Sequence, residues 1–320
     1  MRGRRNNNAK EGALKRLLIA LAASVGFCVN ALGAQIDRMA EQEGTQERAA
    51  ADRALDTVIV ARAGALNLKS AAAIVVRMDD GRPLYAKNTD EVMPIASITK
   101  LMTAMVVLDS RLSLIEPITI TTADIDRIKG TRSRLKVGAK LARARLLRLA
   151  LMSSENRAAA ALTRAYPGGL RAFVAAMNRK AVELGMWRSR FVEGTGLSSD
   201  NVSTARDLAI MVKSAYGYPL IREYTTESAY AVKVAKGRTL RYRNTNRLVQ
   251  NADWEIGLSK TGYIREAGRC LVMQTVIAAT PVIIVLLDSW GRLARIGDAN
   301  RIRKWIKTNR LRQVTGPPES

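Results

Sequence analysis

Apolar residues are grouped in short runs near both ends of the chain and at helically spaced positions between them. Residues 71–77 form one run, the dipeptide Asp80-Gly81 follows, and a second run covers residues 83–86. Asp-Gly between two apolar runs is typical of a tight turn, so these segments predict a β-hairpin. Near the other end, apolar runs predict three more strands at residues 257–264, 270–278 and 282–287.

The segment between these strands has helical periodicity. Residues 95–108 follow Pro94 and are apolar almost all round, which predicts a buried helix. Further helices are predicted at residues 143–151, 156–166, 170–184, 204–216 and, as a last amphipathic helix, 298–308. This order of elements predicts a mixed α/β (α+β) fold. An antiparallel sheet with flanking helices is built from both chain ends, and a helical lobe packs beside it.

The first residues have the pattern of a secretory signal. Residues 1–16 carry six basic residues and one acid, residues 17–29 are apolar, and small residues follow at 31–34. We therefore expect residues 1–34 to be a signal peptide that exports the protein to the periplasm, with an uncleaved anchor helix as the alternative. Beyond it, we expect a linker, one folded domain and a flexible tail, at residues 35–69, 70–310 and 311–320.

Composition excludes several kinds of chemistry. The chain has 320 residues and no histidine, which excludes Ser-His-Asp and Cys-His catalysis and a zinc site with histidine ligands. If the chain is a hydrolase, its base must be Lys, Asp, Glu or Tyr, and we expect no metal or other cofactor. Cys28 lies in the predicted signal peptide, so Cys270 stands alone and no internal disulfide is expected in the mature chain.

The formal net charge is +24, and +19 of it lies beyond residue 34. Such an excess favours an anionic polymer or surface as partner. We expect no nucleic-acid partner, because aromatic residues make up only 5% of the chain and no zinc-finger or RNA-binding signature occurs. The last helix is basic, and we expect it to pack on the sheet; peripheral association with the inner membrane is the alternative.

Ser97 and Lys100 form an S-x-x-K motif at the start of the predicted buried helix. A spacing of three residues places both side chains on one helix face. A serine hydroxyl needs a base to become a nucleophile, and a lysine can be that base only when it is neutral. Burial lowers the pKa of a lysine, as does a second cation such as Lys260. This motif therefore allows a serine nucleophile with a lysine base. By itself it fits equally a serine near a helix start with an ordinary lysine.

Ser154 and Asn156 form an S-x-N motif just before another predicted helix. A serine hydroxyl both donates and accepts, so Ser154 can relay a proton, and the amide of Asn156 can hold a peptide carbonyl or orient the lysine. The alternative is that Ser153 and Ser154 are N-caps of that helix.

Lys260, Thr261 and Gly262 form a K-T-G motif on a predicted strand. The lysine offers a fixed positive charge and the threonine a hydroxyl, and Gly262 allows a substrate backbone to approach closely. Tyr263 follows, and its backbone N–H can donate toward an oxyanion.

The three motifs, in this order, are those of penicillin-binding proteins and class A β-lactamases, here with Glu155 at the centre of the second. Over roughly residues 70–308 the chain resembles low-molecular-mass penicillin-binding proteins of the D-alanyl-D-alanine endopeptidase kind. The resemblance also includes residues 96–103, 129–134, 151–158, 194–201 and 266–273. It implies the fold shared by D,D-peptidases and serine β-lactamases, with a D,D-peptidase catalytic domain at residues 70–310.

The resemblance implies a role for each motif residue. Ser97 is the expected nucleophile and Lys100 its base. Ser154 is expected to pass a proton to the leaving amine, and Asn156 to bind the substrate amide. Peptidoglycan peptides are the implied substrates, and β-lactams the implied covalent inhibitors.

The third motif is expected to hold the leaving group. Lys260 and Thr261 would bind the free carboxylate of the leaving D-residue. The backbone N–H groups of Ser97 and Tyr263 would form the oxyanion hole. No metal takes part in this scheme.

Three alternatives to a crosslink-cleaving endopeptidase stay open. A carboxypeptidase would use the same contacts, because both leaving groups have a D-configured carbon with a free α-carboxylate; only the longer resemblance favours the endopeptidase. A serine β-lactamase needs a base for deacylation, for which Glu183 and Glu193 are candidates, although neither lies in a recognised loop of that kind. A non-catalytic wall-binding protein is disfavoured by the intact motifs.

Overall fold

The computed structural model describes residues 66–234 and 237–314. The predicted signal peptide, nearly all of the predicted linker and the last six residues of the predicted tail lie outside the described residues.

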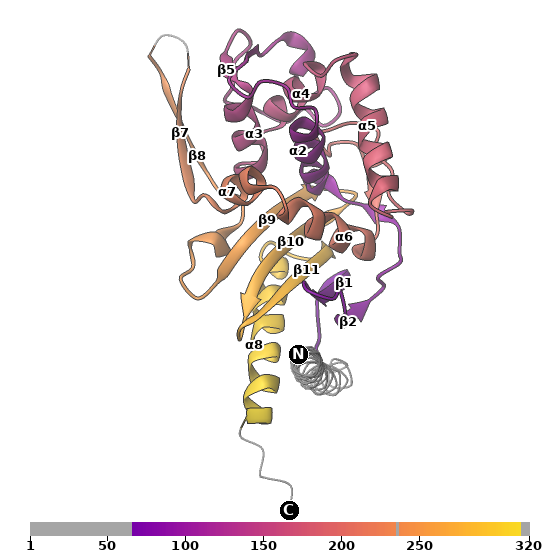
Figure 1. The fold of residues 1–320 in the computed structure, drawn as a ribbon. Helices are drawn as coiled ribbons and strands as arrows, with labels where there is room; N and C mark the ends of the chain where they lie inside the picture. Colours follow the sequence, from indigo (N-terminus) through magenta and orange to yellow (C-terminus); the bar gives the residue numbers. More distant parts are fainter. Residues whose placement is uncertain (1–65, 235–236, 315–320) are drawn as a thin grey trace, which may run out of the picture. The chain divides into compact units, whose positions relative to one another are not determined.

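The centre of the described part is a five-stranded antiparallel sheet with the strand order β2-β1-β11-β10-β9. Its strands are β1 (Ser70–Arg77), β2 (Pro83–Lys87), β9 (Glu255–Ile264), β10 (Gly268–Ile277) and β11 (Thr280–Ser289). The first hairpin pairs with the last strand, with Ala73 opposite Leu286. The prediction of an antiparallel sheet built from both chain ends is therefore confirmed (Figure 1).

Both faces of the sheet are covered, which explains why its strands are continuous apolar runs. In β1, Ile74 and Val76 join the core on the side of the helical lobe, whereas Ala73 and Val75 join the core on the opposite face. The lobe side is covered by α6 (Ala205–Tyr216), and the opposite side by α8 (Ala294–Val314). Each buried strand position removes apolar surface from water and so stabilises the sheet.

The helix α8 packs on the sheet, as predicted, through Ala299, Ile302 and Ile306. It begins four residues before the predicted start and continues to Val314. Asp298, the predicted first residue, lies inside the helix and is fully buried. Its carboxylate accepts hydrogen bonds from the backbone N–H and the Oγ of Ser70, at 2.8 and 2.6 Å, and so ties α8 to β1.

The helical lobe surrounds α2 (Thr99–Asp109), whose residues are all buried from Thr99 to Val107, as the sequence predicts. The other predicted helices are confirmed within two residues, as α3 (Arg143–Met152), α4 (Asn156–Arg164), α5 (Gly169–Glu183) and α6. The sequence pattern does not predict α7 (Pro219–Thr226) or three pairs of short strands. These pairs are β3 (Met93–Pro94) with β6 (Val202–Ser203), β4 (Pro117–Thr119) with β5 (Lys140–Ala142), and β7 (Ala229–Lys233) with β8 (Thr239–Arg243).

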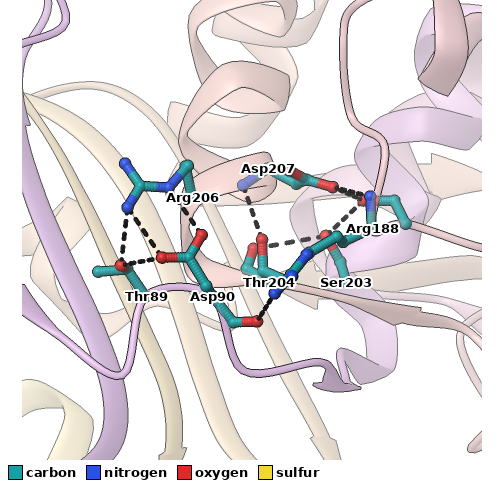
Figure 2. A network of polar contacts seen from close by, with 8 residues as sticks. Thr89, Asp90, Arg188, Ser203, Thr204, Arg206 and Asp207 are labelled. Carbon is teal, nitrogen blue, oxygen red and sulfur yellow. Dashed lines mark hydrogen bonds and ion pairs between the residues drawn. The ribbon is translucent and has the colours of Figure 1, made fainter.

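A polar network fixes the start of α6 to the segment between β2 and β3 (Figure 2). Thr204 caps α6 by accepting from the backbone N–H of Asp207 at 3.0 Å. The guanidinium of Arg206 donates to the carboxylate of Asp90 at 2.8 Å, and this contact lowers the pKa of Asp90 to about 2. Arg188 joins both sides, because its side chain donates to the Asp90 carbonyl and its N–H to the Asp207 carboxylate. The chain leading to Ser97 is thereby anchored.

Candidate active site

A cleft of about 420 Å³ lies between β9 and the helical lobe and brings the three motifs together. Ser97 lies in a 3-10 turn, Ala96–Ile98, directly before α2. Ser154 lies between α3 and α4, and Asn156 is the first residue of α4. The cleft is lined by Ser97, Lys129, Thr131, Ser154, Asn156, Leu197, Thr245, Thr261, Gly262, Tyr263, Ile264, Arg265 and Arg295. The motif lysines lie beneath its floor, because Lys100 and Lys260 are each only 1% exposed.

The buried amine of Lys100 contacts the hydroxyl of Ser97. Lys100 Nζ lies 2.8 Å from Ser97 Oγ, 2.8 Å from Asn156 Oδ1 and 2.5 Å from the carbonyl oxygen of Thr195. Burial lowers the pKa of Lys100 to about 8, although Glu193 and other nearby carboxylates oppose this shift. At pH 7 about one Lys100 in ten is then neutral and able to take a proton from Ser97.

A second buried lysine holds the second motif serine. Lys260 Nζ donates to Ser154 Oγ at 3.0 Å and to the carbonyl oxygen of Thr261 at 2.9 Å. Burial holds the pKa of Lys260 well below its usual value, and the charges of Lys100 and Arg295 lower it further. An incoming carboxylate favours the charged form of a lysine, so a substrate carboxylate near Lys260 raises its pKa again.

Ser154 has a left-handed backbone, with φ of +58°, and this conformation is uncommon for a residue with a side chain. The alternative that Ser153 or Ser154 caps α4 is wrong, because the N-cap is Glu155, whose side chain accepts from the N–H of Arg157. Ser153 instead donates to the carbonyl of Leu149 at 2.8 Å. The hydroxyl of Ser154 therefore remains in the cleft, beside Lys260.

Asn156 is oriented by residues to which sequence analysis assigned no role. Its Nδ2 donates to Thr131 Oγ1 at 2.9 Å, and Thr131 Oγ1 donates to the Asp126 carboxylate at 2.6 Å. This chain of hydrogen bonds fixes Asn156 Oδ1 toward Lys100. The resemblance over residues 129–134 marked this segment, but only its fold places it against α4.

Two glycines enclose the turn that carries Ser97. A Cβ on Gly262 would lie 2.9 Å from the carbonyl oxygen of Ile95 and 3.1 Å from the N of Ser97. A Cβ on Gly196, where φ is +77°, would lie 2.0 Å from the carbonyl oxygen of Ala96. Gly262 thus allows β9 to pack closely against the turn that carries Ser97. It also lines the cleft, and the approach of a substrate backbone at this glycine stays a prediction.

The far part of the cleft is positively charged. Arg295, on α8, donates to the carbonyl oxygens of Gly262 and Cys270 at 3.0 and 3.3 Å, and its Nε has no hydrogen-bond partner within the described residues. Thr261 Oγ1 lies 2.6 Å from Thr245 Oγ1. Sequence analysis missed Arg295 and Thr245 because nothing in the pattern of their own segments points to the cleft.

Neither glutamate considered as a deacylating base lines this cleft. Glu183 is exposed at the end of α5. The carboxylate of Glu193 is occupied, because it accepts hydrogen bonds from Gly196 N at 2.6 Å, Leu197 N at 3.0 Å and Asn201 Nδ2 at 2.8 Å. Glu193 therefore shapes the loop whose Thr195 carbonyl holds Lys100.

A second cavity, of about 360 Å³, adjoins the cleft and shares Asn156 and Leu197 with it. It is lined mostly by apolar groups, including Ile125, Ile128 and Leu170, and by none of the reactive motif serines or lysines. Within residues 66–234 and 237–314, no cluster of acidic or cysteine side chains is arranged to hold a metal ion. The cleft with Ser97 is therefore the candidate active site.

Comparisons with known proteins show the family of the chain. Residues 59–290 match the model of the peptidase S11 family, described as D-alanyl-D-alanine carboxypeptidase. A D-alanyl-D-alanine endopeptidase of Pseudomonas aeruginosa is 50% identical over 252 residues, which cover 78% of this chain and 80% of that protein. One of Escherichia coli is 47% identical and covers 77% and 80%. The carboxypeptidase DacF of Bacillus subtilis is 29% identical and covers 66% and 55%.

The same fold occurs in solved structures. The Streptomyces K15 DD-transpeptidase has a TM-score of 0.69 and 29% identity, and covers 76% of this chain and 98% of that one. The ampicillin-bound penicillin-binding protein D2 of Listeria monocytogenes has a TM-score of 0.66 and 30% identity, and covers 75% and 98%. These likenesses confirm the predicted fold class.

Proposed function

Because the chain belongs to the peptidase S11 family of D-alanyl-D-alanine carboxypeptidases, we propose that it hydrolyses D-alanyl–diaminopimelate crosslinks in peptidoglycan through an acyl-enzyme on Ser97. It is a serine-type D-Ala-D-Ala hydrolase. The observation that carries the proposal is the 2.8 Å contact between Lys100 Nζ and Ser97 Oγ at the floor of the cleft. Cleavage of crosslinks, rather than removal of terminal D-alanine, is supported by the two endopeptidases at 50% and 47% identity.

Acylation begins when the neutral amine of Lys100 takes the proton of Ser97. Ser97 Oγ then bonds to the carbonyl carbon of D-alanine, and the backbone N–H groups of Ser97 and Tyr263 stabilise the oxyanion. Asn156, held by Thr131, binds the substrate amide. Asn156 also contacts Lys100, so the same side chain positions the base relative to the substrate.

The amine leaves when the bond between the carbonyl carbon and nitrogen breaks. The proton that Lys100 took is returned to this amine by way of Ser154, whose hydroxyl is held by Lys260. Lys260 and Thr261 bind the free α-carboxylate of the leaving D-centre, and Arg295 adds a third positive or polar group at this end of the cleft. Water then hydrolyses the ester and restores Ser97.

A serine β-lactamase is disfavoured because the carboxylate of Glu193 already accepts several hydrogen bonds from its own loop. Because no Asp or Glu of the described residues lines the cleft, a penicilloyl group on Ser97 should persist. β-Lactams are therefore proposed as covalent inhibitors, acting through the same nucleophile.

We further propose that residues 1–34 export the protein to the periplasm and that residues 70–310 form the catalytic domain. The basic stretch, apolar run and small residues at the N-terminus support export. Among the described helices, none is both long and apolar enough to cross a bilayer. Packing of the buried face of α8 on the sheet favours a wall substrate over the membrane as the partner of this domain.

The proposal is tested with purified protein lacking residues 1–34, using Ser97→Ala as control, on a mixture of crosslinked tetrapeptide dimers and pentapeptide monomers. Products are followed by liquid chromatography and mass spectrometry. We expect dimers to fall to monomers in a Ser97-dependent way. Loss of D-alanine from pentapeptides alone would show a carboxypeptidase instead, and no change in either substrate would contradict the peptidase function.

A further inference from the structure

The hairpin of β7 and β8 has one apolar face and one basic face. Val232, Leu240 and Tyr242 point inward and are buried. Lys233, Arg241 and Arg243 are exposed on the other face, where their cross-strand neighbours are small, namely Thr239, Ala231 and Ala229. Small neighbours leave the long cationic side chains free to reach a partner. In Figure 1 the two strands stand away from the central sheet, on the side of α3 and β5.

Two acid-free stretches of the chain meet at this hairpin. Residues 228–252 contain six basic residues and no acid, and residues 127–154 contain nine and no acid. Arg134 joins the two stretches, because its guanidinium lies 3.9 Å from the centre of the Tyr242 ring and donates to the Arg241 carbonyl. The guanidinium of Arg148 likewise lies 4.6 Å from the centre of the Tyr230 ring. Arg148 also forms ion pairs with Glu223 and Glu227.

The cations of the outer face are not neutralised within the described part of the chain. Arg241, Arg243 and Lys233 make no ion pair with any described acid, whereas Arg148 and Lys129 do. Alternate residues of a strand lie about 7 Å apart on one face, so Arg241 and Arg243 form a closely spaced pair of charges. Their fields add, which favours a partner with several negative charges over a single anion.

This basic face begins at the rim of the cleft. β8 ends at Arg243, and Thr245, two residues later, lines the cleft and contacts Thr261. Lys129 and Thr131, from the other acid-free stretch, line the same cleft. A polymer that enters the cleft with one crosslink therefore has its adjoining segments near the hairpin.

We propose that the outer face of the β7–β8 hairpin, formed by Lys233, Arg241 and Arg243, binds carboxylate-bearing segments of the peptidoglycan polymer outside the cleft. The inference rests on the proposed function for the identity of the polymer. A lipid surface fits less well, because the exposed neighbours on this face are Ala229, Ala231 and Thr239, which cannot insert into a bilayer. Nucleic acid fits less well because this face carries no exposed aromatic ring on which bases could stack.

The binding test uses inactive Ser97→Ala protein and purified sacculi in a sedimentation assay. The hairpin variant Arg241→Gln/Arg243→Gln is compared with Arg171→Gln/Arg179→Gln, which removes the same charge from two exposed arginines on α5. We expect the hairpin variant to bind about fivefold more weakly at low salt, and the α5 variant to bind as the parent does. Arg241→Lys/Arg243→Lys should restore most of the binding, and about 1 M salt should remove the difference.

Equal weakening in both glutamine variants would overturn the inference, since it would show a general charge effect. Unchanged binding in the hairpin variant would overturn it too, as would weaker binding of that variant to anionic phospholipid vesicles but not to sacculi.

With Ser97 intact, the hairpin variant should cleave soluble dimers at the parental rate and sacculi more slowly. If the parent itself fails to cleave dimers, the proposed function fails. Binding by the inactive protein still decides the hairpin inference by itself.

Discussion

The acylation rate should follow the ionisation of Lys100. Lys100 must be neutral to accept the proton of Ser97, and burial lowers the pKa of this lysine to about 8. The neutral fraction is then about one half at pH 8 and about one hundredth at pH 6. A rate that depends on this fraction falls about fiftyfold between the two pH values, with a slope of tenfold per unit well below pH 8.

The assay is stopped-flow acylation by a chromogenic cephalosporin, measured as a second-order rate constant between pH 5.5 and 9. Protein fluorescence across the same range shows that the fold is intact. A rate that is flat from pH 6 to pH 9 would refute the reasoning. So would a rate that still rises tenfold per unit up to pH 9, as expected for a lysine with its ordinary pKa of 10.5.

A variant separates Lys100 from other titrating groups. The carboxylate of Glu193 is the largest influence that raises the pKa of Lys100. Glu193→Gln removes this charge while keeping an oxygen acceptor for the loop, so the acid limb should move to lower pH. An acid limb that stays in place, in a variant that still reacts, would show that another group controls the rate.

Three further substitutions test the packing around the site. Gly196→Ala should lower the free energy of unfolding by about 1–3 kcal/mol, because the new Cβ would clash with the Ala96 carbonyl at a left-handed backbone position. Thermal unfolding measures this loss, and an unchanged melting temperature would contradict it. Thr131→Val should lower kcat/KM about fivefold by freeing the amide of Asn156, and Thr131→Ser should restore activity; equal activity of the valine variant would remove this positioning role. Asp298→Asn should destabilise the protein by about 2 kcal/mol in urea unfolding, because the buried carboxylate accepts hydrogen bonds from the backbone N–H and the hydroxyl of Ser70. A urea midpoint equal to the parent's would show that this contact is dispensable.

Much of the fold could be predicted because both faces of the sheet are buried. Strands with two buried faces are continuous apolar runs, so all five strands of the central sheet were found, each short by no more than a few residues. The β7–β8 hairpin was missed because its outer positions carry lysine and arginine and its inner face is short. Its inner tyrosines, Tyr242 and Tyr230, pack against Arg134 and Arg148, and periodicity cannot show such contacts between distant segments.

In the candidate site, too, some residues could be predicted from the sequence and others could not. The motif residues could be identified because each spacing is local and each residue type has a defined chemistry. Arg295 lies 33 residues beyond Gly262, and its contact with the Gly262 carbonyl depends on how α8 packs, which local spacing does not show. The packing of Gly262 against Ile95 and Ser97 could not be predicted, because these residues are far away in the sequence.

The most direct test of the central claim is to trap the acyl-enzyme. Protein with an intact nucleophile is mixed with crosslinked tetrapeptide dimer or with a penicillin, quenched in acid, digested and mapped by mass spectrometry. The account predicts an added acyl mass on the peptide that contains Ser97, and no such mass in Ser97→Ala protein. An adduct on a different residue, or release of monomers without any covalent intermediate, would contradict it.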